Sequence, residues 1–299
     1  MFDRASLRGI IPPIATPLTT GGEIDRSGMG RLVEHVLTAG CHGLFVLGST
    51  GEFAFLTARQ RREAVEAAVD AVAGRVPVIA GISAVGTQEA VDHCRAAMAS
   101  GADFVMVTPP YFGSMVVRQE WIADHVLQIV AETDARVMLY NVPPLITDID
   151  PRTVARLAED DHIVGMKDSA PLLHVQDVLF RTREMGFRVL CGSEYHLAAT
   201  LMVGAHGGTP SPANLIPRPY VELYEATVSG DVTRALALQE QVNRFSDTLD
   251  EIPSWPSAVK GALNLMGICG PTMAAPLPSL TAAELDLVRG HLERSGLLA

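Results

Sequence analysis

Eight short apolar runs rich in β-branched residues constrain the fold of this sequence more than any other feature. Each of the first seven is followed by a segment with helical periodicity or composition, which indicates parallel strands joined by crossover helices. Eight such units are the number that closes a barrel, so the sequence predicts an α/β fold, a (β/α)8 TIM barrel. The runs begin near Ile10, Gly43, Pro77, Phe104, Arg136, Ile163, Arg188 and Gly207.

The segments between the runs carry helix signals of their own. Residues 58 to 74 place alanine and valine at the three and four residue spacing of one helix face. The segment from Thr87 to Gly101 repeats this plan, with Thr87 as the expected N-cap and Gly101 as the expected stop. These local signals agree with the alternation of strand and helix.

The strand pattern ends after the eighth run. We therefore expect residues 1–218 to form the barrel and residues 219–299 to form a C-terminal helical extension packed on it. No Gly/Ser-rich or charged linker separates the two, which argues against an independent second domain. The expected helices of the extension run from Pro219 to Ser229, Asp231 to Asp247, Pro256 to Met266 and Ala282 to Arg294.

The charge of the chain narrows the classes of partner. A formal net charge of −11 and a pI near 5.2 leave no broad basic surface, which argues against nucleic acid or an anionic membrane as the main ligand. The four cysteines lie far apart without zinc-type spacing and are expected to be buried free thiols. No signal peptide or membrane-spanning run stands out, so we expect a cytoplasmic protein that acts on small molecules.

Catalytic side chains of such barrels lie at the carboxyl ends of the strands. The sixth run ends in Lys167, and lysine is seldom buried without a partner or a purpose. In a desolvated barrel mouth the charged form is disfavoured, which makes a neutral amine available to attack a carbonyl. A lysine paired with Asp168 would give the same pattern, so this residue alone leaves both interpretations open.

Two neighbouring strand ends supply groups that such a lysine needs. Tyr140 ends the fifth run, and carbinolamine formation and dehydration require a group that gives and takes protons. After the second run, Ser49 and Thr50 stand between two glycines, a loop suited to binding a carboxylate or a phosphate. A tyrosine in a packing role and a plain capped turn remain the alternatives, but the groups together form a coherent site.

Tyr111 follows the fourth run, in a stiff loop with two prolines. Such an exposed aromatic residue could cover a pocket, meet a neighbouring subunit or simply anchor its own loop.

These motifs resemble the dihydrodipicolinate synthase and N-acetylneuraminate lyase superfamily of pyruvate-type class I aldolases. The resemblance covers nearly the whole chain, and its pieces stand in the family's order: GSTGE at Gly48, TPPYF at Thr108, YNVP at Tyr140 and GMKDS at Gly165. It implies a lyase that forms a Schiff base on a barrel and uses no cofactor or metal. It also implies a homo-oligomer, a dimer or a tetramer.

The resemblance assigns roles residue by residue. Lys167 matches the Schiff-base lysine, and Tyr140 matches the tyrosine that relays protons. Ser49 and Thr50 match the pair that binds the keto-acid carboxylate, with Ser49 continuing the relay. Tyr111 matches a tyrosine that reaches into a neighbouring subunit's site, and Thr209 matches a strand-end residue whose carbonyl lies near the lysine.

Departures from the family pattern concern the second substrate. Dihydrodipicolinate synthases usually carry an arginine two residues after the proline of YNVP, where this chain has Leu145 preceded by Pro144. The resemblance therefore favours the aldolases of sugar acids. Polar groups at Ser169, Glu194 and Ser211 could bind hydroxyls of an extended keto acid, or could satisfy loop backbone.

The function expected from the sequence is aldol cleavage or synthesis of a 2-keto-3-deoxy sugar acid or a similar 4-hydroxy-2-keto acid. The alternatives are a 4-hydroxy-tetrahydrodipicolinate synthase that condenses pyruvate with aspartate semialdehyde, a 2-keto-3-deoxy acid dehydratase and a non-catalytic keto-acid sensor. A metal-dependent aldolase would need clustered ligands at strand ends, where only Glu194 and His196 qualify. A phosphosugar isomerase could use the loop at Gly207 for phosphate but would not call for Tyr140 with Lys167.

Overall fold

The protein is described by a computed structural model that covers all residues except 1, 113–116, 144, 250, 253 and 299. Pro144, which the sequence places beside Leu145, thus lies outside the described residues.

The strands of the described chain coincide with the eight apolar runs, and each of them begins within two residues of the expected start. They are β1 Gly9–Ile10, β2 Leu44–Val46, β3 Val78–Gly81, β4 Phe104–Val107, β5 Val137–Asn141, β6 Ile163–Asp168, β7 Arg188–Cys191 and β8 Gly207–Gly208.

Every strand pairs in parallel with its neighbours, in the order β1-β8-β7-β6-β5-β4-β3-β2. A parallel bridge between Pro13, just beyond β1, and Phe45 of β2 closes the circle. The predicted (β/α)8 barrel is confirmed. All strand ends of one direction therefore meet at one mouth, which brings together residues far apart in sequence.

One cluster of side chains fills the inside of the barrel. Its members come from the strands or from residues next to them and contact one another, and Tyr140 lies among them at the mouth. They are Leu7, Ile11, Phe45, Ile79, Phe104, Met106, Met138, Tyr140, Val164 and Leu190. A second and larger cluster packs the outer faces of the strands against the helices.

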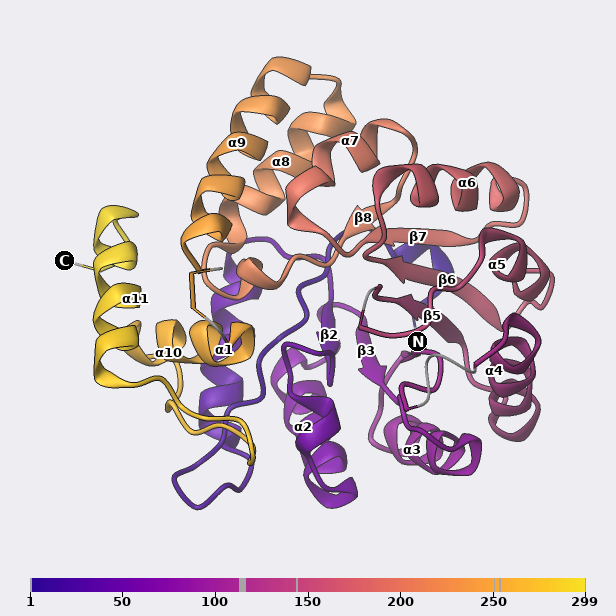
Figure 1. Ribbon diagram of the computed structural model, residues 1–299, viewed down its shortest axis with the longest axis horizontal. Helices are drawn as coiled ribbons and strands as arrows, with labels where there is room; N and C mark the ends of the chain where they lie inside the picture. The colour runs from indigo at the N-terminus through magenta and orange to yellow at the C-terminus, as the bar shows by residue number, and fades with distance from the viewer. Residues whose placement is uncertain (1, 113–116, 144, 250, 253, 299) are drawn as a thin grey trace.

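A ring of helices surrounds the strands (Figure 1). Its helices are α1 Arg26–Thr38, α2 Ala58–Val72, α3 Thr87–Ala99, α4 Gln119–Thr133, α5 Pro151–Leu157, α6 Leu172–Thr182, α7 Leu197–Met202 and α8 Pro217–Ser229. Short 3-10 turns occur at η1 Arg4–Ser6, η2 Phe53–Phe55, η3 Glu194–His196 and η4 Ser211–Asn214.

The ends of α3 correct one local prediction. Gly86, not Thr87, is the N-cap of this helix. Thr87 begins the helix, and its hydroxyl forms a hydrogen bond of 2.9 Å with Nδ1 of His125 on α4. Gly101 takes the left-handed conformation expected of a helix stop, with φ 92°.

Three further helices follow the barrel: α9 Val232–Leu249, α10 Trp255–Leu265 and α11 Ala282–Arg294. With α8 they match the four helices expected beyond the eighth run. Figure 1 shows α9, α10 and α11 on one side of the barrel. Because α8 packs on β1 and is the first α-helix after β8, following the short turn η4, it takes the place of the barrel's eighth helix. The division into residues 1–218 and 219–299 stays a prediction.

Candidate active site

Lys167 and Tyr140 lie side by side at the barrel mouth. They are paired in the register of β6 and β5, and each residue is 4% exposed. The Nζ atom of Lys167 lies 4.5 Å from the centre of the Tyr140 ring and 5.4 Å from that of Phe45. The lysine is therefore buried among the aromatic rings of the barrel interior.

An irregularity in β6 turns Lys167 to the inside. Val137 pairs with Ile163, but the next residue of β5, Met138, pairs with Gly165, so β6 contains one extra residue. Val164 packs in the barrel interior, whereas Met166, two residues on, packs in the outer cluster. The extra residue thus shifts the alternation of the strand and gives Lys167 the inward position.

Ser49 completes a chain of hydroxyl groups with Tyr140. The two hydroxyl oxygens lie 3.3 Å apart. Either can donate, so this pair can pass a proton in both directions. The structure therefore brings together three residues that the sequence selected, Ser49 after β2, Tyr140 on β5 and Lys167 on β6.

The loop that carries Ser49 and Thr50 is tightly packed. A Cβ on Gly48 would lie 2.7 Å from the Phe45 ring, and a Cβ on Gly51 would lie 3.0 Å from the carbonyl oxygen of Ile14. Glycine suits both positions because a side chain at either one would crowd its neighbours. Thr50 forms a hydrogen bond of 2.7 Å with the hydroxyl of Ser211.

Ser169 and Thr209 lie at the same mouth. A Cβ on Gly192, just after β7, would come within 2.0 Å of the Ser169 hydroxyl and 3.0 Å of the Lys167 Cε atom. Ser169 and the lysine stem therefore share the space above Gly192. Thr209, fully buried, donates its backbone N–H to the Cys191 carbonyl at 2.7 Å.

Glu194 and Tyr111 make contacts with residues outside the group formed by Lys167, Tyr140 and Ser49. The backbone carbonyl of Glu194 accepts a hydrogen bond of 2.6 Å from Gln239 on α9. Burial raises the pKa of Tyr220 on α8 well above its usual value, and the charge of Glu194 adds to this. The ring of Tyr111 packs edge-on against Phe53 at 5.9 Å, and burial raises the pKa of its hydroxyl.

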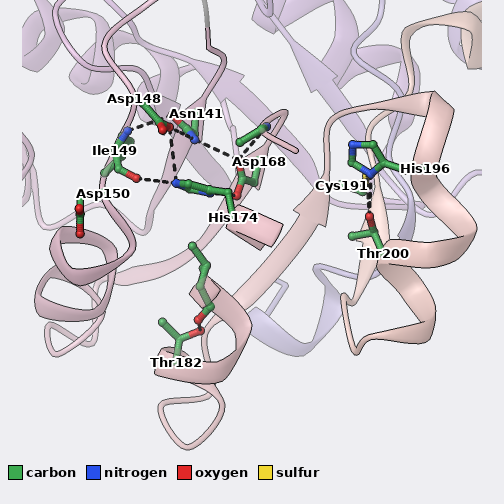
Figure 2. A network of polar contacts seen from close by, with 12 residues as sticks. Asn141, Asp148, Ile149, Asp150, Asp168, His174, Thr182, Cys191, His196 and Thr200 are labelled. Atoms are coloured by element: carbon green, nitrogen blue, oxygen red, sulfur yellow. Dashed lines mark hydrogen bonds and ion pairs between the residues drawn. The ribbon is translucent and has the colours of Figure 1, made fainter. Parts of the chain in front are cut away.

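A buried polar network supports the two strands from behind (Figure 2). Asn141 and Asp168, the residues after Tyr140 and Lys167, are paired in register, and the Asn141 amide donates to Asp168 at 3.0 Å. His174 on α6 contacts the other oxygen of Asp168 at 2.7 Å and the Ile149 carbonyl at 3.0 Å. Because these outward side chains are tied together, the inward residues beside them are held in register.

His174 is charged in this setting. Burial works against the imidazolium, but the hydrogen bond to Asp168 and the charges of Asp168 and Asp148 raise its pKa to about 9. Sequence reasoning missed Asn141, His174 and Gly192 as residues of the site. In the sequence, Asn141 directly follows Tyr140, and His174 comes shortly after Lys167 and Asp168. Only the fold shows that the side chains of Asn141 and His174 meet at Asp168.

Other features of the described chain bear on the remaining predictions. All four cysteines are free and buried, as expected. His196 bonds to the Thr200 hydroxyl at 2.9 Å, and among the described residues no group of three His, Cys, Asp or Glu side chains could hold a metal ion.

A hollow of about 750 Å³ between α1, α8, α9 and α11 is lined by none of the residues around Lys167. Within the described ranges, no helix is long and apolar enough to cross a membrane.

Comparison with known proteins places this site in a family. The model of the dihydrodipicolinate synthetase family matches residues 6–294. The chain belongs to this family. The family expected from the sequence motifs is thereby confirmed, and with it a class I, Schiff-base type of carbon–carbon lyase.

Relatives within the family carry different names. The chain is 36% identical to the 4-hydroxy-tetrahydrodipicolinate synthase of Gluconacetobacter diazotrophicus, over 99% of this chain and 100% of that one. It is 32% identical to a probable 2-dehydro-3-deoxy-D-pentonate aldolase of Escherichia coli, over 97% of this chain and 98% of that one. Because relatives of similar identity are named as different enzymes, membership of the family does not identify the substrate of this chain.

Solved structures agree with the fold. The dihydrodipicolinate synthase of Bacteroides thetaiotaomicron superposes with a TM-score of 0.90 at 34% identity and covers 96% of this chain and 98% of its own. A dihydrodipicolinic acid synthase family protein of Escherichia coli K12, solved in complex with pyruvate, gives 0.91 at 30% identity, over 97% and 99%. Both matches thus cover nearly the whole chain.

Proposed function

We propose that the protein forms a Schiff base between Lys167 and the C2 carbonyl of pyruvate or a larger 2-keto acid, and makes or breaks the adjacent carbon–carbon bond. The observation that carries this proposal is the buried Lys167 amine packed on Tyr140, whose hydroxyl reaches Ser49 at 3.3 Å. A nucleophilic amine and a proton relay are the two components that this chemistry needs.

The steps follow from these groups. The neutral Lys167 amine adds to C2, and the resulting carbinolamine loses its hydroxyl as water with a proton from Tyr140. The iminium then accepts the electron pair released when C3 gives a proton to the Tyr140 phenolate. In the cleavage direction the C4 hydroxyl gives up its proton there instead, and the C3–C4 bond breaks to release an aldehyde. The enamine formed can attack an aldehyde in the synthetic direction. Because the iminium is the electron sink, the proposed chemistry uses no cofactor or metal.

Residues around this centre have supporting roles in the proposal. Ser49 and Thr50 bind the keto-acid carboxylate, and Ser169, which shares the space above Gly192 with the lysine, contacts the rest of the substrate. Thr209, Glu194 and Ser211 are proposed to complete the substrate site. Tyr111 is proposed to act at the contact with a second subunit of a homo-oligomer.

Two candidates for the second substrate are each favoured by an observation. Several relatives, including that of Gluconacetobacter diazotrophicus, are named 4-hydroxy-tetrahydrodipicolinate synthase, which favours condensation of pyruvate with aspartate semialdehyde. Leu145 is 70% exposed and offers no charge to a second carboxylate, which favours aldol chemistry on a sugar-derived keto acid. The relatives' names support the condensation more strongly.

Reductive trapping tests the Schiff base directly. The sequence contains two lysines, Lys167 and Lys260, so the site of an adduct is easily mapped. The folded protein is treated with pyruvate and borohydride, and its peptides are analysed by mass spectrometry. We expect the pyruvate-derived adduct on Lys167. Folded protein without that adduct would overturn the mechanism.

Product assays then separate the candidates. Condensation of pyruvate with aspartate semialdehyde is compared with pyruvate release from 2-keto-3-deoxygluconate, 4-hydroxy-2-oxoglutarate and N-acetylneuraminate. A dominant condensation rate assigns the synthase, and dominant pyruvate release assigns the aldolase. Turnover of a 2-keto-3-deoxy acid without pyruvate release would indicate the dehydratase. Trapping without any turnover would indicate a keto-acid sensor.

A further inference from the structure

The chain's second lysine lies fully buried in an ion pair beneath the loop that carries Ser49 and Thr50. Lys260 of α10 contacts the carboxylate of Glu52, and both side chains are 0% exposed. Lys260 also donates to the carbonyl oxygen of Thr272 at 2.9 Å. The other carboxylate oxygen of Glu52 accepts the backbone N–H of Ala274 at 2.7 Å. The extension thus supplies two donors to one residue of the loop.

The position of this ion pair points to a role in geometry rather than in stability. Taking two charges out of water costs free energy that their attraction only partly offsets. A protein with two apolar side chains in place of a buried ion pair is often equally stable. Glu52 has a left-handed backbone, with φ 61°, and its N–H donates to the Ser49 carbonyl at 3.1 Å. The anchored carboxylate therefore fixes the turn from which Ser49 and Thr50 project.

A second polar link joins α10 to the same loop. The indole N–H of Trp255 donates to the Ser211 hydroxyl oxygen at 2.8 Å, and that hydroxyl lies 2.7 Å from the Thr50 hydroxyl. Indole nitrogen is only a donor. Ser211 can thus accept from Trp255 and donate its own proton to Thr50, which leaves the Thr50 proton for a ligand.

We propose that α10 is a positioning element of the keto-acid site: Lys260, through Glu52, holds the loop, and Trp255, through Ser211, orients the Thr50 hydroxyl toward the substrate carboxylate. This inference rests on the proposed function. It assigns the C-terminal extension a part in recognising the carboxylate that all candidate keto acids share. Neither Lys260 nor Trp255 touches the reacting atoms in this scheme.

The test compares a ketone that has the carboxylate with one that lacks it. Borohydride trapping of Lys167 is measured against the concentration of pyruvate and, separately, of acetone, in wild type, Trp255→Phe, Lys260→Met and the double variant Glu52→Leu/Lys260→Met. We expect the pyruvate concentration for half-maximal trapping to rise about tenfold in each variant, as for a lost polar interaction. Trapping by acetone should change less than about twofold.

Two controls separate positioning from general damage. Trp121→Phe alters the other tryptophan, which is 51% exposed on α4. This variant should leave the concentration dependence of trapping unchanged for both pyruvate and acetone. The double variant replaces the ion pair by apolar side chains, so its melting temperature should recover relative to Lys260→Met while the defect with pyruvate persists. Trp255→Phe provides a third test that does not disturb the buried charges.

The possible results separate a failure of the positioning role from a failure of the proposed Schiff-base function. Variants with unchanged pyruvate dependence, or with equal losses for pyruvate and acetone, would overturn the positioning role alone. A wild-type protein that pyruvate fails to trap would overturn the proposed function and this inference with it.

Discussion

Tyr140 and Lys167 face each other across two paired strands, with the lysine nitrogen 4.5 Å from the centre of the tyrosine ring. Their outward neighbours, Asn141 and Asp168, are hydrogen-bonded at 3.0 Å. The candidate active site and its support thus alternate along the same two strands. Substitutions can therefore test the inward catalytic candidates and their outward supporting residues separately.

Removing the relay hydroxyl should slow the chemistry while leaving the lysine in place. Tyr140→Phe is expected to lower kcat by about 100-fold to 10,000-fold, the usual contribution of a positioned acid or base. Steady-state kinetics with the best substrate measure the loss, and Lys167→Met, which should be inactive, sets the baseline. If the phenylalanine variant turned over at the wild-type rate, Tyr140 would have no part in proton transfer.

Ser49 and Tyr140 should act as one unit because their hydroxyl groups lie 3.3 Å apart. Ser49→Ala is expected to lower kcat about tenfold, and the double variant with Tyr140→Phe should lose less than the sum of the two free energies. A double-mutant cycle on kcat checks this. Strict additivity would show that the two hydroxyl groups work independently.

Gly192→Ala should displace the reacting lysine. The new Cβ would come within 2.0 Å of the Ser169 hydroxyl and 3.0 Å of Lys167 Cε, and misplacement by about 1 Å can cost about 100-fold in rate. The rate of pyruvate trapping reports on the lysine directly. Gly30→Ala is the matched control, since Gly30 lies in α1 with nothing within 4 Å of its Cβ position. An active Gly192→Ala variant would contradict the packing.

The charge on His174 should make stability depend on pH. Its pKa is 6.5 when unfolded and about 9 when folded, so it stabilises the fold fully below about pH 6.5 and loses this contribution as the pH rises through about 9. The gap corresponds to on the order of 3 kcal/mol. Urea unfolding of wild type and His174→Gln at several pH values measures the effect. The difference between them should shrink toward pH 10, and a difference that stayed constant would refute the imidazolium.

Leu145 should control use of a second carboxylate. Leu145→Arg places a bidentate donor at a position that is 70% exposed and is expected to lower the KM for aspartate semialdehyde about tenfold. Leu145→Lys serves as the comparison, because its point charge lacks the forked geometry of arginine. Equal KM values for all three proteins would place the second substrate elsewhere.

The sequence revealed much of the fold because its signals are local. Each apolar run became a strand, and helices followed at the expected places, because strand and helix periods depend on residues a few positions apart. The error at the start of α3 had a non-local cause: Thr87 has the chemistry of a cap, but its hydroxyl forms a hydrogen bond with His125 of the next helix. A tertiary contact overrode the local preference.

The sequence by itself determined the barrel, the family and the identity of its candidate residues, since lysine, tyrosine and serine at strand ends carry their chemistry wherever the fold places them. Only the tertiary structure decided which of them meet. The extra residue in β6 turned Lys167 inward, and a strand's side chains change face with a shift of one residue. Likewise Glu52 and Lys260 lie far apart in the sequence, and no local pattern encodes their contact.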